Sequence, residues 1–232
     1  MRLHYLQHVP FEDLANIEVW AKDRGHSLSK TLLFNGEPVP GLDKFDWLVV
    51  MGGPMSIYEE EKFPWLAHEK RFIRRSIESG KIVLGVCLGA QLIADILGGR
   101  VRRNEHREIG WHRVSLTSDG LRSRIFGVLP EHFTAFHWHG DTFDIPPAAA
   151  RMAESRACLN QAFEVGKSIG LQFHLESSMS SINSLIENCR EELAGGEFVQ
   201  LPEEITGCKR YIIETNGLME KLMDRIEDCF WN

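Results

Sequence analysis

The sequence has no apolar run approaching the roughly 18 residues that a membrane-spanning helix requires. It also lacks an excess of basic residues, because 26 Lys and Arg stand against 33 Asp and Glu and give a formal net charge of −7. A general binder of nucleic acid or of anionic membranes normally shows the opposite balance. The first residues lack the apolar segment and cleavage site of a signal peptide. We therefore predict a cytoplasmic protein that binds neither nucleic acid nor membranes.

Closely spaced cysteine pairs are also missing. The cysteines are Cys87, Cys158, Cys189, Cys208 and Cys229. Without a C-x-x-C pair, a zinc ribbon or a thioredoxin-type redox motif is not expected. A disulfide framework is equally unexpected in a reducing compartment. Since a free cysteine usually behaves as a small buried hydrophobe, the open question is whether one of the five is a nucleophile.

The first half of the sequence alternates segments typical of strands and of helices. Residues 45–51 form a nearly continuous apolar run, as expected of a parallel strand buried on both faces. Residues 81–86 predict another buried strand, and residues 11–24, 65–79 and 88–97 predict helices. This alternation predicts a three-layer α/β fold, in which helices flank a central, mostly parallel sheet.

The second half of the sequence is richer in short predicted strands, over residues 111–116, 133–137, 151–154, 162–165 and 168–173. A helix is predicted over residues 182–193, and Gly195 and Gly196 then interrupt the pattern. Residues 211–230 have the spacing of an amphipathic helix, which is more typical of a packed core face than of a partner-binding stripe. We therefore divide the chain into a domain over residues 1–195 and a helical C-terminal extension, residues 196–232, packed on the same domain.

The segment Gly85-Val86-Cys87-Leu88-Gly89 follows a predicted buried strand and precedes a predicted helix. This is the context of a nucleophile elbow, a sharp turn that exposes one side chain. Cys87 would lie at a helix N-terminus, where the helix dipole favours a thiolate. The amide of Leu88 would point toward an incoming carbonyl as an oxyanion donor. A buried structural cysteine explains the same pattern equally well.

His174 and Glu176 lie two residues apart near the end of the last apolar strand, so their side chains would share a face. A thiolate nucleophile usually needs a histidine and a third group that orients it. An exposed polar pair at a strand end is the alternative. Gly52-Gly53-Pro54 follows another predicted strand, at the sheet edge where ligands bind in α/β folds, although a tight turn would also explain it.

Together, these three segments resemble the class I glutamine amidotransferase family, and most closely the glutaminase domain of GMP synthetase and its stand-alone relatives. The family pattern is matched by GGP at 52–54, G-x-C-x-G-x-Q at 85–91 and G-x-Q-F-H-x-E at 170–176. The resemblance covers about residues 45–180 and implies the family's flavodoxin-like fold. It implies that Cys87 is the nucleophile, that His174 is the base and acid, and that Glu176 orients the histidine.

The resemblance also implies roles in binding. The amides of Gly53 and Leu88 would form the oxyanion hole, and Gln91 would help to hold the substrate. Residues 138–141 are similar to the loop that recognises the α-amino and α-carboxylate groups of glutamine. From this loop we carry over Trp138, Gly140 and Asp141 as substrate-binding residues. Leu175 stands where many members have proline, so the geometry of the His–Glu pair would be set differently.

The activity implied is hydrolysis of the glutamine side-chain amide through a γ-glutamyl thioester, with no cofactor. The ammonia would pass to a separate synthetase subunit, because the sequence has no G-x-x-x-x-G-K-[ST] phosphate loop and too few residues for a fused synthetase. The alternatives are a γ-glutamyl peptide or conjugate hydrolase that acts alone, and a non-catalytic regulatory module with the same fold. The C-terminal extension would cover the sheet, dock a partner or form a homodimer contact.

A metal site was weighed at His137, His139 and Asp141, whose i, i+2, i+4 spacing would place them on one face of a strand. His106 and His112 would be further ligands. Because a single H-x-H is a weak signal and lies in the substrate loop, we predict no metal. The basic residues of the segment 100–113 predict a solvated face rather than an anion site.

Overall fold

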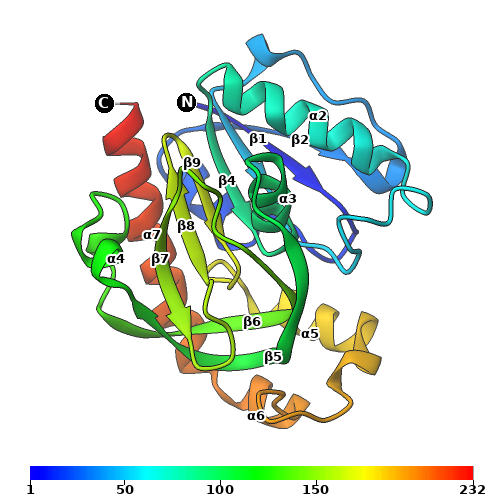
Figure 1. Ribbon diagram of the computed structural model, residues 1–232, viewed down its shortest axis with the longest axis vertical. Helices are drawn as coiled ribbons and strands as arrows, with labels where there is room; N and C mark the ends of the chain where they lie inside the picture. The colour runs from blue at the N-terminus through cyan, green and yellow to red at the C-terminus, as the bar shows by residue number, and fades with distance from the viewer. Residues whose placement is uncertain (232) are drawn as a thin grey trace.

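The structure is a computed structural model that describes residues 1–231. Within these residues, the strands form one sheet of nine, in the order β2-β1-β3-β4-β9-β8-β7-β5-β6 (Figure 1). The strands are β1 (Arg2–Gln7), β2 (Ser27–Leu32), β3 (Trp47–Val50), β4 (Ile82–Val86), β5 (Val101–Leu116), β6 (His132–Phe143), β7 (Ala150–Ser155), β8 (Ala162–Val165) and β9 (Ser168–Leu171).

The parallel half of the sheet consists of β2, β1, β3, β4 and β9. Successive side chains of β3 point to opposite faces, so Trp47 belongs to one core layer and Leu48 to the other. Helices α2 (Trp65–Glu78) and α3 (Leu88–Ile96) cover the Leu48 face, whereas α1 (Asn16–Asp23) and α7 (Lys209–Phe230) cover the Trp47 face. The predicted three-layer α/β fold is confirmed.

The antiparallel half of the sheet consists of β8, β7, β5 and β6. Strands β5 and β6 are long and pair with a register shift between Arg103 and Glu108. Figure 1 shows both strands crossing below β4, β9 and β8. The short helix α4 (Ser118–Arg122) lies between β5 and β6 in the chain. Only the C-terminal part of β5 was predicted, because its polar N-terminal part, around Arg103 and Glu108, has no apolar alternation.

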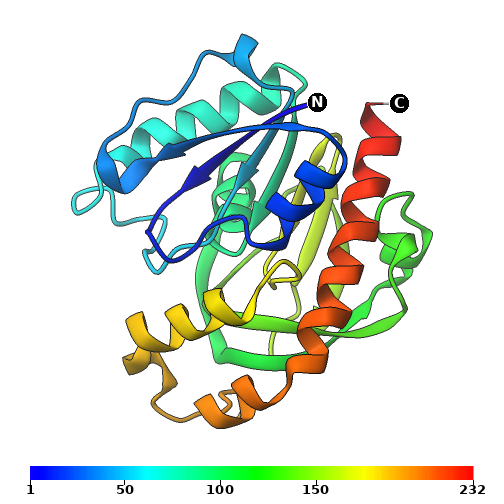
Figure 2. The ribbon, with the colours of Figure 1, turned by 180° about the vertical axis from the view of Figure 1, so that it is seen from behind.

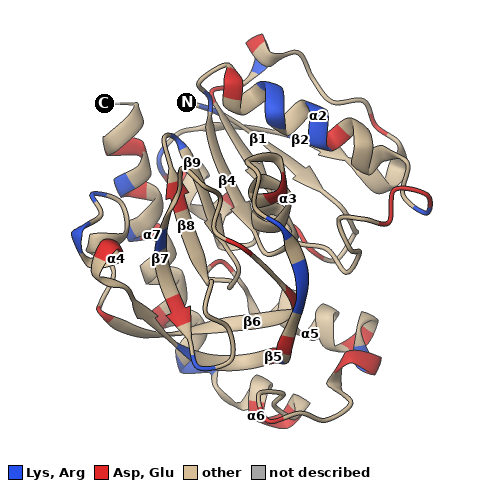
Figure 3. Cartoon of the chain, in the orientation of Figure 1, with Lys and Arg blue, Asp and Glu red and all other residues tan. Residues whose placement is uncertain are grey.

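The chain after β9 forms α5 (Met179–Asn188), α6 (Pro202–Gly207) and α7. Helix α7 lies beside α1 (Figure 2), where Trp20 Nε1 and Arg24 both donate hydrogen bonds to the carboxylate of Asp224. Both α7 and α2 carry basic as well as acidic residues (Figure 3). Because α7 supplies buried residues such as Leu222 to the core, we propose that residues 196–232 extend one domain, with Asn232 outside the described residues.

The first helix begins later than the sequence predicts. Residues 11–15 form a loop, and α1 starts only at Asn16, after Ala15 with a φ of 42°. Leu14 is buried in the core although its backbone is not helical. Its apolar side chain therefore fits the spacing of a helix without lying in one. The loop carries Glu12 to the end of the parallel strands. None of the helices in residues 1–231 combines the length and apolarity needed to cross a bilayer.

Candidate active site

Cys87 lies between β4 and α3 with a φ of 52° and a ψ of −107°. This conformation is strained for a non-glycine residue, at a cost on the order of 1–3 kcal/mol, and such residues cluster at functional sites. The glycines around Cys87 are required by close backbone packing. A Cβ on Gly89 would lie 2.0 Å from the carbonyl oxygen of Val50, and one on Gly85 would lie 2.4 Å from the carbonyl carbon of Gly89.

The Cys87 thiol is buried among polar partners. Its Sγ lies 3.6 Å from the carbonyl oxygen of Trp138, to which it donates, and 3.6 Å from Nε2 of Gln172, from which it accepts. The thiol also interacts with the side chain of His174. Burial raises the pKa of the thiol, and the interactions with His174 and the Leu88 amide offset this effect only in part. Burial therefore disfavours the thiolate, and the nucleophile needs a base that takes its proton.

His174 and Glu176 form a buried pair next to Cys87, with 2.6 Å between Nδ1 and Oε1. This bond leaves Nε2 of the imidazole for the thiol. Burial alone would lower the pKa of His174, but Glu176 and Cys87 raise it well above 6.5. Leu175 between them is fully buried in the core, so its packing fixes the segment that carries the pair.

Backbone pairing places His174 beside the antiparallel half of the sheet. His174 N–H donates to the carbonyl of Phe136 at 2.8 Å, and the Phe136 N–H donates back at 3.2 Å. When a carboxylate orients an imidazole that lies beside a thiol, the imidazole can transfer a proton from the nucleophile to a leaving group. The structure thus brings together the three residues predicted as the triad.

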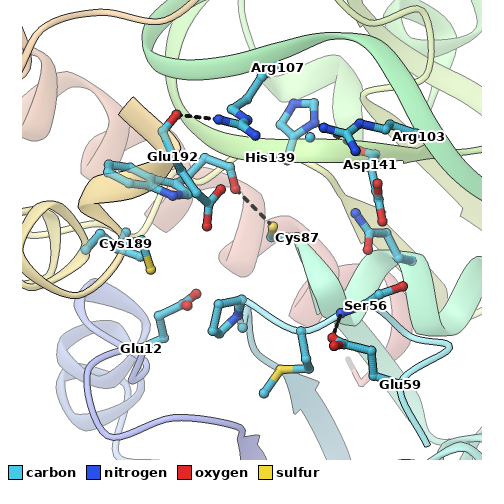
Figure 4. Close-up of a pocket in the computed structure, with 17 residues that line it drawn as sticks. Glu12, Ser56, Glu59, Cys87, Arg103, Arg107, His139, Asp141, Cys189 and Glu192 are labelled. Carbon is cyan, nitrogen blue, oxygen red and sulfur yellow. Dashed lines mark hydrogen bonds between the residues drawn. The ribbon is translucent and has the colours of Figure 1, made fainter. Parts of the chain in front are cut away.

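A pocket of about 380 Å³ opens above Cys87 (Figure 4). Its lining includes the predicted residues Gly53, Cys87, Gln91, Trp138, Gly140 and Asp141. His174 and Glu176 line a smaller cavity that shares Glu12 with the main pocket. All predicted site residues except Leu88 thus line one of these two cavities, and Leu88 follows Cys87 at the start of α3.

The turn containing Gly53 is held from behind by a buried hydrogen-bond chain. His8 Nδ1 lies 2.9 Å from the carbonyl of Gly52, and its Nε2 lies 2.8 Å from a carboxylate oxygen of Glu69. A Cβ on Gly53 would approach Leu88 Cδ2 to 3.0 Å, so the two residues predicted as oxyanion donors are neighbours. Gln91 Nε2 donates to Gln172 Oε1 at 3.2 Å, which fixes its amide at the pocket wall.

Five charged pocket residues were not predicted as site residues. These are Glu12, Glu59, Arg103, Arg107 and Glu192. Burial raises the pKa of Glu12 to about 7, against the opposing effect of the positive charge of His174. Arg103 is exposed, as the predicted solvated face requires, and also lines the pocket. Arg107 is half-buried and donates to the carbonyl of Glu192 at 2.7 Å. Figure 4 shows Glu12 and Glu192 on one side of Cys87, and Asp141 and Arg103 on the other.

His137 and His139, the two candidate metal ligands, lie beside a different carboxylate from the one that the sequence indicates. His137 and His139 share a face of β6, but the carboxylate beside them belongs to Glu108 of β5 rather than to Asp141. Asp141 instead lines the main pocket. No sequence pattern points to Glu108, because it lies 29 positions before His137 and only the strand register brings the two residues together.

Known proteins share this architecture. The family model described as "Glutamine amidotransferase class-I" matches residues 19–192. The glutamine amidotransferase-like protein YfeJ of Salmonella typhimurium is 34% identical over 202 residues, which cover 85% of this chain and 84% of that protein. A glutamine amidotransferase from Thermotoga maritima has a crystal structure with a TM-score of 0.89, 34% identity and 97% coverage of both chains.

The glutamine-hydrolysing GMP synthase of Thermomicrobium roseum is 36% identical over 143 residues. The aligned region covers 60% of this chain but only 25% of the synthase. The similarity to this synthase therefore concerns about a quarter of its length.

Proposed function

The chain belongs to the class I glutamine amidotransferase family, and on that basis we propose that it hydrolyses the side-chain amide of glutamine through a γ-glutamyl thioester on Cys87. The observation that carries the proposal is the buried series Cys87, His174 and Glu176, in which each residue interacts with the next. The pocket above Cys87 supplies room for the substrate. Family membership itself supports an enzyme of the glutamine amidotransferase type.

In the first half-reaction, His174 takes the thiol proton and Cys87 Sγ attacks the amide carbon. The carbonyl oxygen becomes an oxyanion that the backbone N–H groups of Gly53 and Leu88 stabilise. His174 then gives its proton to the amide nitrogen, the C–N bond breaks, and ammonia leaves. Glu176 stabilises the imidazolium formed in between. The product on the enzyme is a γ-glutamyl thioester.

In the second half-reaction, His174 takes a proton from water, and the resulting hydroxide attacks the thioester carbon. The same two amides receive the second oxyanion. The C–S bond breaks, the proton returns from His174 to the Cys87 sulfur, and glutamate leaves. The protein needs no other group for either half-reaction.

We propose that a separate synthetase subunit consumes the ammonia. The support is the similarity to GMP synthase, whose name joins glutamine hydrolysis to a synthesis step and of which only a quarter aligns with this chain. The test is glutamate release from glutamine, with and without candidate synthetases from the same cell. Stimulation by one of them supports the pairing, and an unchanged rate with all of them contradicts it. A homodimer remains a prediction, which sedimentation of the purified chain would test.

The nucleophile is tested by Cys87→Ala, which should lower glutamate release by at least about 10³-fold. Cys229→Ser is the matched control, because this partly exposed thiol of α7 lies outside the pocket lining. A glutamine-analogue alkylator should modify Cys87 alone. Equal glutamate release by Cys87→Ala and wild type would overturn the assignment, and inactivity of the wild type on every substrate would favour a non-catalytic regulatory module.

A second candidate function is hydrolysis of γ-glutamyl peptides or conjugates. Arg103 lines the pocket, and no hydrogen bond or ion pair reaches its guanidinium from the rest of residues 1–231. An unpaired guanidinium suits a carboxylate, and the pocket volume falls within the range of about 300–1,000 Å³ typical of larger ligands. This function predicts that γ-glutamylglycine is hydrolysed faster than glutamine. Arg103→Met should then remove the preference for the dipeptide.

A further inference from the structure

Glu108 and His139 lie directly opposite each other in the pairing of β5 with β6, and His137 lies two residues earlier on the same face. All three side chains are buried, at 1%, 4% and 0% exposure for Glu108, His139 and His137. One ligand atom from each lies within 4.8 Å of the others. A carboxylate and two imidazoles thus converge inside the protein, apart from Cys87, His174 and Glu176.

The hydrogen bonds of His139 determine which of its nitrogens carries a proton. Nδ1 lies 3.0 Å from the carbonyl oxygen of Asp141, which can only accept, so Nδ1 must donate. In a neutral ring, Nε2 then carries a lone pair. That lone pair faces the Glu108 carboxylate, with 3.2 Å between Nε2 and Oε2. Two acceptors face each other, so a cation is required between them, either a proton or a metal ion.

His137 is the observation that favours a metal ion. Its Nδ1 lies 3.4 Å from the same Oε2 of Glu108. Neither ring nitrogen has a hydrogen-bond partner within residues 1–231, although the side chain is fully buried. A buried imidazole without partners loses the hydrogen bonds it makes in water. A proton shared between Glu108 and His139 leaves this loss unexplained, whereas a metal ion would bind the lone pair of His137.

The two separations between the carboxylate oxygen and the imidazole nitrogens fit zinc. Zinc binds histidine nitrogen and carboxylate oxygen at about 2.0–2.1 Å, and in a tetrahedron such bonds place neighbouring ligand atoms roughly 3.3–3.5 Å apart. The measured separations from Glu108 Oε2 are 3.2 Å to His139 and 3.4 Å to His137. The bond from His139 Nδ1 to a backbone carbonyl is also typical, since metal-bound histidines usually donate their other N–H in this way.

We infer that Glu108, His137 and His139 bind one Zn²⁺ ion, with a fourth position left for water. Gln161 Nε2 and Ser155 Oγ donate to Glu108 Oε2 at 2.6 and 3.1 Å and hold the carboxylate in place. A carboxylate oxygen has about two lone-pair sites, so an ion bound at Oε2 would take the place of the longer bond, the one from Ser155. The ion would join β5 to β6 at Trp138, whose carbonyl accepts from Cys87. It would support the pocket wall and take no part in the proposed reaction.

The experiment measures zinc in the Cys87→Ser chain, because the Cys87–His174 pair could itself bind zinc. After incubation with Zn²⁺ and dialysis, elemental analysis should find one zinc per chain. Glu108→Gln and His139→Gln in this background should each lose it. His132→Gln should retain it, because His132 lies on β6 with its side chain 45% exposed. Equal zinc retention in folded variants of all three kinds would overturn the inference.

A second measurement needs no substitution in the cluster. Co²⁺ added to the Cys87→Ser chain should give the intense visible absorption of a tetrahedral site with nitrogen and oxygen ligands, and Zn²⁺ should displace it. Absence of both the absorption and any retained zinc would mean that a proton joins Glu108 to His139, and would overturn the metal site. This measurement tests the metal site even if Glu108→Gln fails to fold.

Discussion

The parallel and antiparallel halves of the sheet contribute different kinds of groups to one pocket. The parallel half supplies groups that the backbone fixes, namely the strained Cys87, the turn at Gly53 and the buried His174. The antiparallel half supplies side chains that remain partly or largely exposed, such as Asp141 and Arg103. The difference suggests a division of labour, in which one half determines the chemistry and the other determines which substrate is held.

The strongest test of this division is Glu176→Gln in the parallel half. The amide keeps the shape of the carboxylate but cannot stabilise the imidazolium, so kcat should fall by about 10⁴-fold, as for comparable triads. The measurement is the steady-state rate of glutamate release. Asp144→Asn, just after β6, serves as the control, because Asp144 is half exposed and its side chain pairs with Arg102 on the surface. A fall of less than tenfold would remove Glu176 from the catalytic series.

The same variant makes a prediction about pH. Activity requires loss of a proton from the Cys87–His174 pair, so kcat/KM should rise as pH passes through the pKa of His174. That pKa lies well above 6.5 because Glu176 and Cys87 raise it against the effect of burial. Replacing the carboxylate removes a raising effect, so the midpoint for Glu176→Gln should move to lower pH. A midpoint that stays in place or moves upward would contradict the proposed pairing.

The backbone of the parallel half is tested by Gly89→Ala. The added Cβ would lie 2.0 Å from the Val50 carbonyl, a backbone atom that cannot move aside alone. We expect the free energy of unfolding in urea to fall by about 1–3 kcal/mol. Gly217→Ala in α7 should instead leave stability unchanged or raise it by up to about 1 kcal/mol, because its Cβ meets nothing within 4 Å. Equal effects would contradict the tight packing of the elbow.

Glu12 tests the loop at the border between the two halves. Burial raises its pKa from 4.5 to about 7, so the folded protein binds a proton more tightly than the unfolded chain. The resulting stability is fully present below pH 4.5 and is lost as pH rises through 7. Glu12→Gln should therefore gain stability relative to wild type between pH 5 and pH 8, by roughly 2 kcal/mol. Thermal unfolding measures this gain, and exposed Glu61→Gln should show none.

The smallest effect is expected in the antiparallel half. Asp141→Asn removes a charge that we predict to contact the α-amino group, so KM for glutamine should rise about tenfold while kcat stays nearly constant. Steady-state kinetics separates the two constants. A large fall in kcat with unchanged KM would contradict the proposed division, in which the parallel half determines the chemistry and the antiparallel half determines substrate binding.

The predicted fold and the proximity of the predicted triad follow from local patterns. Buried parallel strands have continuous apolar runs, and the turn at Cys87 requires glycines that are visible in the sequence. The His174–Glu176 pair lies after β9, where an isolated bridge to Phe136 and the burial of Leu175 place both side chains on the side of Cys87. The buried strands and the turn at Cys87 depend on residues close together in the chain.

The remaining site residues depend on tertiary packing. The sequence pattern places Glu12 in a helix, because Leu14 fits the spacing of a helix. In the structure both residues lie in a loop, and the loop buries Leu14 in the core. Glu108 meets His139 only through the register of β5 and β6, which is shifted near Arg103. A bulge of this kind changes which face each residue occupies and leaves no clear trace in the sequence.

Helix α7 has a consequence for how the protein is made. It supplies Met219, Leu222 and Ile226 to the same core as Trp20 of α1, although about 190 positions separate the two helices. During synthesis, the first strands and α1 emerge from the ribosome long before their cover exists. Until then the apolar face of the growing chain stays open to solvent, so the nascent protein should depend on chaperones until its last helix has been released.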